Sequence, residues 1–122
     1  MELKALDIDF SICKILDTSQ VNFDDEYWFL CKTDEELSLV CQSIYIPKNT
    51  SKRDDGWRAF RIQGILDFSM VGILSKISTV LAENKIGIFA VSTYNTDYIL
   101  VKSQNFHLAL EALKQAGYSI LK

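Results

Sequence analysis

Hydrophobic and polar residues in the second half of the chain alternate in some segments, as in strands, and follow helical spacing in others. A period of two with aromatic and β-branched residues predicts a strand over residues 57–65. An apolar stripe at helical spacing predicts a helix over residues 71–83. Two apolar runs, residues 86–92 and 98–101, predict two more strands with a polar turn between them.

The last part of the chain completes this pattern. A second helical stripe begins at Phe106, and Gly117 stands where a glycine usually ends a helix. Residues 118–121 then predict a short closing strand. The order β-α-β-β-α-β is the α+β ferredoxin-like arrangement, in which both helices cover one face of a four-stranded antiparallel sheet.

The first half of the chain is rich in strand patterns and lacks an amphipathic helix of ten or more residues. Strands are predicted over residues 6–13 and 27–32, and strand character resumes at residues 39–41 and 44–46. We expect this half to pack against, or extend, the sheet of the second half.

Residues 47–56 are polar and contain the only proline, so they predict an exposed linker or long loop. We therefore divide the chain into an N-terminal half with its linker, residues 1–56, and a C-terminal domain, residues 57–122.

Composition narrows the class of protein. The chain has 122 residues, of which 48% are hydrophobic and 24% charged, as in an ordinary globular domain. Its net charge of −3 argues against a nucleic-acid binder, which normally presents a basic face. The N-terminus lacks the pattern of a signal peptide, and no run approaches the ~20 apolar residues of a membrane span. We expect a cytoplasmic protein without membrane contact.

Candidate chemistry is sparse. Cys13, Cys31 and Cys41 form no C-x-x-C pair, so reduced thiols are expected rather than a zinc site. No nucleophile or phosphate-loop motif is present, and His107 falls on a predicted helix surface. The acidic runs at residues 24–26 and 34–36 are typical of solvated turns. We expect no catalytic activity, no metal and no cofactor.

Two loops stand out as a candidate ligand site. Residues 66–72 lead into a helix, whose first N–H groups bind carboxylates well, and Gly72 leaves that backbone open to close approach. Residues 92–97 carry hydroxyl, amide and carboxylate groups between apolar strands. Donors for an anion and an acceptor for a cation suit a zwitterionic amino acid. The alternative interpretation is a helix cap and a polar hairpin turn.

Residues 57–121 resemble the ACT domain, a small regulatory module of amino-acid metabolism. Within this family, the chain resembles most specifically the aspartate-kinase regulatory regions and the CASTOR arginine sensors with their small bacterial relatives. It rests on Gly72-Ile73-Leu74, Leu81-Ala82-Glu83, Ile86-Gly87-Ile88-Phe89, Leu110-Glu111-Ala112-Leu113 and the string from Ser92 to Val101. Residues 33–41 also resemble the degenerate N-terminal ACT-like half of the small relatives.

The resemblance implies a non-enzymatic amino-acid sensor that forms a homodimer and acts through an unknown partner protein. Together with the two loops, it gives the candidate ligand-binding residues Asp67, Ser69, Met70, Val71, Gly72, Thr93, Tyr94, Asn95 and Asp97. Asn84-Lys85 replaces the usual glycine after the first helix, so one of them is expected at positive φ. The first half lacks a comparable ligand loop.

Two other functions remain open at this point. One is a structural interaction domain without a small-molecule ligand. The other is an RNA-binding domain, since RNA recognition motifs share the same element order. The cluster of Lys48, Lys52, Arg53, Arg58 and Arg61 keeps the second alternative open, although the expected aromatic signature is missing from residues 98–101.

Overall fold

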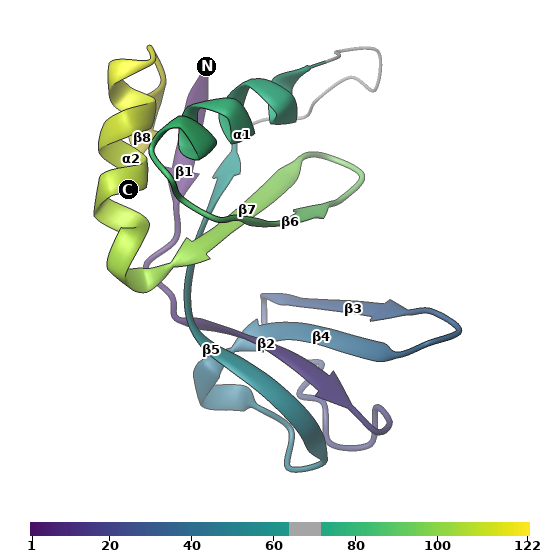
Figure 1. Ribbon diagram of the computed structural model, residues 1–122. Coiled ribbons are helices and arrows are strands. Elements are labelled where there is room, and N and C mark those ends of the chain that lie inside the picture. Colours follow the sequence, from purple (N-terminus) through teal and green to yellow (C-terminus); the bar gives the residue numbers. More distant parts are fainter. Residues whose placement is uncertain (64–71) are drawn as a thin grey trace. The chain divides into compact units, whose positions relative to one another are not determined.

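The computed structural model of the chain describes residues 1–63 and 72–122 (Figure 1). The chain forms two compact units. We call them the helical unit, Met1–Asp7 with Arg58–Lys122, and the strand unit, Ile8–Trp57. The division into domains at residue 56 stays a prediction, and these compact units differ from it in that Met1–Asp7 belongs with the second half of the chain.

The helical unit has the predicted α+β ferredoxin-like order of elements (Figure 1). Its sheet has the order β8-β1-β5-β7-β6, and two helices accompany it. The elements are β1 (Glu2–Ala5), the end of β5 (Thr50–Ile62), α1 (Ile73–Glu83), β6 (Phe89–Ser92), β7 (Asp97–Lys102), the 3₁₀ turn η2 (Ser103–Asn105), α2 (Phe106–Gln115) and β8 (Ser119–Leu121).

Strand β1 is an addition to the four-stranded antiparallel sheet that the sequence predicted. It lies between β8 and β5, parallel to the first and antiparallel to the second. Leu3 is opposite Ile62 on one side and Ile120 on the other. Leu3 and Ala5 are both buried in the core of this unit, which is why four residues at the start of the chain join its sheet.

The core of the helical unit lies between one face of the sheet and the two helices. Phe60 and Ile62 of β5 are fully buried there, as are Ile77 of α1 and Leu113 of α2. The helical stripes read from the sequence therefore point toward the sheet. Among the described residues, the buried members of this core are Leu3, Ala5, Phe60, Ile62, Ile77, Leu81, Ile86, Ile99, Val101, Phe106, Ala109, Leu110 and Leu113.

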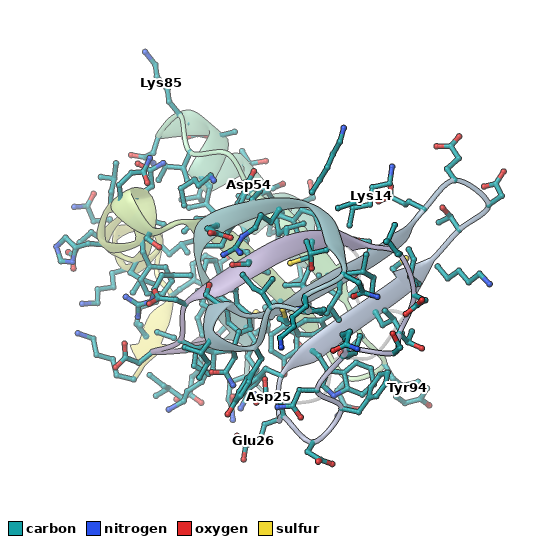
Figure 2. All side chains as sticks on the ribbon, turned by 90° about the horizontal axis from the view of Figure 1, so that it is seen from below. Lys14, Asp25, Glu26, Asp54, Lys85 and Tyr94 are labelled. Carbon is teal, nitrogen blue, oxygen red and sulfur yellow. The ribbon has the colours of Figure 1, made fainter. Side chains whose placement is uncertain are left out.

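Both helices end as the sequence predicted. Lys85, directly after α1, has φ +60°, which confirms that one residue of the Asn84-Lys85 pair adopts the left-handed conformation. The amide of Ile86 donates to the carbonyl of Leu81, and that of Lys85 to Ala82, as in a Schellman motif. The Lys85 side chain extends away from the ribbon (Figure 2). Gly117 has φ +103° after α2.

The strand unit consists of β2 (Phe10–Ile15), β3 (Trp28–Lys32), β4 (Leu37–Gln42), the 3₁₀ turn η1 (Ser43–Tyr45) and the start of β5, with the strand order β3-β4-β2-β5. Two predictions for this half were wrong. The strand predicted over residues 6–13 is interrupted, since β2 begins only at Phe10. Residues 43–45 form the 3₁₀ turn rather than a strand, and Ile44 is exposed there.

The linker prediction for residues 47–56 was also wrong, because β5 begins at Thr50. Its polar residues are paired along β2, from Ile15↔Thr50 to Ile12↔Asp54, and residues 51–55 are exposed. Gly56 has φ +82° where the register to β2 shifts, as at a β-bulge. Backbone pairing thus forms a strand from a segment without apolar alternation.

Candidate functional site

The connection between β6 and β7 brings four of the predicted site residues into one turn. Ser92 and Asp97 face each other as the last pair of the hairpin. The amide and the hydroxyl of Thr93 both donate to the carbonyl of Thr96, at 2.8 and 2.9 Å. Tyr94 and Asn95 form the exposed tip, and 81% of the Tyr94 surface is accessible. The turn therefore holds Thr93, Tyr94, Asn95 and Asp97 in a hydrogen-bonded frame.

Thr96 connects this turn to the neighbouring strand. It is one of the two buried polar residues among those described, and only 7% of its surface is accessible. Its hydroxyl donates a 2.7 Å hydrogen bond to the backbone carbonyl of Ile62, at the end of β5. A neutral buried hydroxyl that is satisfied in this way fixes the turn at small cost.

Asp97 lies at the base of the turn, at the start of β7. The Ser92 hydroxyl donates a 2.6 Å hydrogen bond to its Oδ1 atom. Since a carboxylate offers about four lone-pair positions, this bond leaves room for a further donor. The side chain is half-buried, and it therefore presents a negative charge next to solvent.

Gly72 is the only residue of the first predicted loop that the structure describes with α1. It is the N-cap of α1, with φ +83°, and the amide of Lys76 donates to its carbonyl. The first turn of α1 contains no acidic side chain, and among the described residues no side chain caps it. Its N–H groups and the positive end of the helix dipole suit an anion. The predicted residues Asp67, Ser69, Met70 and Val71 lie outside the described residues.

The cysteines occupy two different environments, both in the strand unit. Cys13 and Cys41 are buried, whereas Cys31 is exposed on β3. A hydrogen bond with the Cys41 thiol lowers the pKa of Cys13, and Arg53 lowers it further, against the effect of burial. The bond with Cys13, together with burial, raises the pKa of Cys41 far above its usual range. Cys41 is therefore a neutral core thiol.

Residues 1–63 and 72–122 contain no group of three His, Cys, Asp or Glu side chains that could hold a metal ion. In the same residues, no helix is long and apolar enough to cross a membrane. His107 is exposed on α2, where the sequence placed it.

Comparison with known proteins places the chain in a family. A family model of the ACT domain matches residues 52–115. A protein of known structure from Agobacterium tumefaciens is 34% identical, with a TM-score of 0.83, and the match covers 98% of this chain and 91% of that one. The chain therefore belongs to the ACT domain family.

Two more distant structures share the fold. The regulatory subunit of aspartate kinase from Thermus thermophilus is 9% identical, with a TM-score of 0.68, over 96% of this chain and 97% of that one. The aspartate kinase of Clostridium acetobutylicum is 15% identical, with a TM-score of 0.66, and the match covers 93% of this chain but 33% of the enzyme. No curated protein matches the sequence.

Proposed function

We propose that this ACT domain protein is a non-catalytic regulatory module that binds an amino acid and signals through a partner protein. The proposed ligand lies between the β6–β7 turn and the start of α1. Asp97 accepts hydrogen bonds from a cationic group of the ligand, and the N–H groups after Gly72 receive its carboxylate. The other predicted residues, Asp67, Ser69, Met70, Val71, Thr93, Tyr94 and Asn95, belong to the same proposed site.

One observation carries this proposal. Thr96 joins the turn that bears Asp97 to the end of β5, and β5 is the strand that precedes α1 in the chain. The Asp97 carboxylate and the start of α1, which no side chain of the described residues caps, thus belong to the same compact unit. The likeness to the aspartate-kinase structures supports an amino acid as the ligand, because one of them is a regulatory subunit and another is an allosteric enzyme of amino-acid production.

A thermal-shift panel of the twenty amino acids tests the proposal. A ligand at 100 times its Kd adds ~2.7 kcal/mol to the free energy of unfolding, which raises the melting temperature by several degrees. We expect at least one amino acid to do so, and calorimetry then gives its affinity. A flat panel at millimolar ligand would overturn the amino-acid proposal and favour a purely structural interaction domain.

We further propose that the protein is a homodimer in which edge strand β3 pairs with its copy. Strand β3 stands at the end of the strand order β3-β4-β2-β5, and its pairing among the described residues is with β4. Trp28 and Leu30 on β3 are both more than one-third exposed, and the Phe23 ring packs edge-on against Trp28 at 4.9 Å. An exposed edge with apolar side chains readily pairs with another chain.

Light scattering at micromolar to near-millimolar concentration tests the dimer. We expect twice the chain mass of 13.9 kDa for the native protein and a monomer for Leu30→Lys. Leu108→Lys serves as the control, because Leu108 is a similarly exposed leucine on α2. A monomer at every concentration excludes the dimer, and an unchanged dimer in Leu30→Lys excludes β3 as its contact.

A further inference from the structure

The helical unit contains a cavity of about 520 Å³. Its lining includes residues of β1, η2 and α2, together with Arg58 of β5. Ala5, Phe106 and Leu110 form an apolar side, while Arg58, Ser103 and His107 contribute polar groups. The volume lies within the range of about 300–1,000 Å³ that is usual for small-molecule sites, and the mixed lining is typical of them.

Arg58 occupies an unusual position for a charged residue. Side chains along a strand alternate between faces, so Arg58 shares its face with Phe60 and Ile62. Both of those residues are fully buried under the helices. Arg58 therefore stands at the end of a core-facing row, where an apolar residue is the usual choice.

The contacts of Arg58 hold its guanidinium in a fixed place. The guanidinium carbon lies 4.2 Å from the centre of the Phe106 ring, as in a cation–π pair. Nη2 donates a 3.2 Å hydrogen bond to the carbonyl of Leu6. Nε is buried without a hydrogen-bond partner among the described residues. Only 27% of the side chain is exposed. Removing a charged group from water in this way costs free energy.

The charge of Arg58 is weakly balanced within the protein. Its one carboxylate neighbour among the described ion pairs is Asp7, at 3.5 Å, and that side chain is fully exposed. An exposed ion pair of this length contributes little. Lys122 also lines the cavity. The charged side chains that line the cavity are thus the basic Arg58 and Lys122 and the acidic Asp7.

We propose that this cavity binds a small organic anion, either a carboxylate or a phosphate monoester, that carries an apolar or aromatic body. The anionic group pairs with the Arg58 guanidinium, which is suited to planar oxyanions. The Ser103 hydroxyl and the His107 imidazole supply further hydrogen bonds. The body of the ligand packs against Ala5 and Leu110.

This site is separate from the proposed amino-acid site. Arg58 and Ile62 stand at opposite ends of the part of β5 that belongs to the helical unit. Thr96 contacts Ile62, whereas the cavity lies at Arg58. The proposal does not rest on the amino-acid site and survives if that site binds nothing.

Amide-resolved NMR on the full chain tests this site with three small probes of one shape. Phenyl phosphate and phenylacetate represent the two anion classes, and 2-phenylethanol is the neutral control. We expect one or both anions to shift the amide signals of residues 103–110 and of Ala5. The neutral alcohol is expected to bind at least about ten-fold more weakly, because it lacks the charge-assisted contact. The anion that binds identifies the class.

Two matched variants assign the effect to Arg58. Arg58→Gln is expected to weaken anion binding by about ten- to a hundred-fold. Arg61→Gln removes a cation three residues further along β5, whose guanidinium lies 5.9 Å from the Tyr98 ring, and is expected to leave binding unchanged. If Arg58→Gln does not fold, His107→Gln on the exposed side of α2 replaces it, and we expect the affinity for the anion to fall several-fold. Added salt is expected to weaken binding of the anions but not of the alcohol.

Three results would overturn the proposal. The first is the absence of shifts at residues 103–110 with both anions. The second is equal affinity for the anions and the neutral alcohol. The third is anion binding that stays unchanged in folded Arg58→Gln or, where that variant does not fold, in His107→Gln.

Discussion

The hydroxyl of Thr96 donates a 2.7 Å hydrogen bond to the backbone carbonyl of Ile62 and so fixes the β6–β7 turn to the end of β5. The turn carries Asp97, whose carboxylate is proposed to bind the ligand, and β5 leads along the chain toward α1. A contact that packs two strands together therefore also positions the proposed ligand site.

Thr96→Val tests the strength of this contact. Valine keeps the shape of the side chain but leaves the buried Ile62 carbonyl without its partner. We expect the free energy of unfolding to fall by about 1–3 kcal/mol, as measured by urea denaturation. Thr93→Val is the control, since Thr93 is exposed and water replaces its lost bonds. Equal losses in the two variants would contradict the structural role of Thr96.

Asp97→Asn separates binding from folding. Asparagine retains an oxygen that accepts from the Ser92 hydroxyl, so stability is expected to change by less than about 1 kcal/mol. Loss of the charge is expected to weaken binding of the amino acid found in the panel by about 1.5–3 kcal/mol, measured by calorimetry.

Ser92→Ala is the complementary variant, because it removes the hydroxyl and keeps the carboxylate. It is expected to retain most of the affinity. Unchanged affinity in Asp97→Asn would remove this carboxylate from the site.

Lys85→Gly is expected to stabilise the protein. Lys85 has φ +60°, a conformation that costs an L-residue roughly 1–2 kcal/mol. The greater freedom of glycine in the unfolded chain offsets roughly 0.5–1 kcal/mol of that gain. A net gain of about 0.5–1 kcal/mol in urea denaturation is therefore expected. Lys85→Ala keeps the strained conformation and should show no comparable gain; an equal gain in both would point to loss of the lysine charge instead.

The thiols are expected to react in two classes. Cys31 is exposed, whereas Cys13 and Cys41 are 2% and 3% exposed, and burial also keeps Cys41 protonated. A chromogenic disulfide reagent at neutral pH should titrate one thiol quickly in the native protein and three in denaturant. Cys31→Ser should abolish the fast reaction, and a fast reaction that persists in this variant would show that the buried pair is accessible.

The parts of the fold that the sequence predicted are those with strong periodicity. The helices around Ile77 and Leu113 and the hairpin with its turn before Asp97 were predicted because buried faces impose a regular spacing. Gly117 and the Asn84-Lys85 pair predicted the helix ends, because the residue after a helix commonly adopts a positive φ.

The failures have a different physical origin. The start of β5, around Arg53, is held by backbone hydrogen bonds to β2 and leaves its side chains exposed, so no apolar pattern reveals it. Strand β1 is short, and its partners lie far away in sequence. The cavity at Arg58 depends on tertiary packing, but one signal was present: an arginine in phase with the apolar Phe60 and Ile62.

The position of β1 between β5 and β8 has a consequence for how the chain acquires its structure. Residues 2–5 leave the ribosome long before Ser119, one of their partners. The strand unit, continuous from Ile8 to Trp57, has all its residues available long before then. Synthesis therefore favours an order in which the strand unit organises before β1 pairs with β8. Only then does the helical unit gain its full sheet, so a chain that stops before β8 lacks part of the unit that carries the proposed ligand sites.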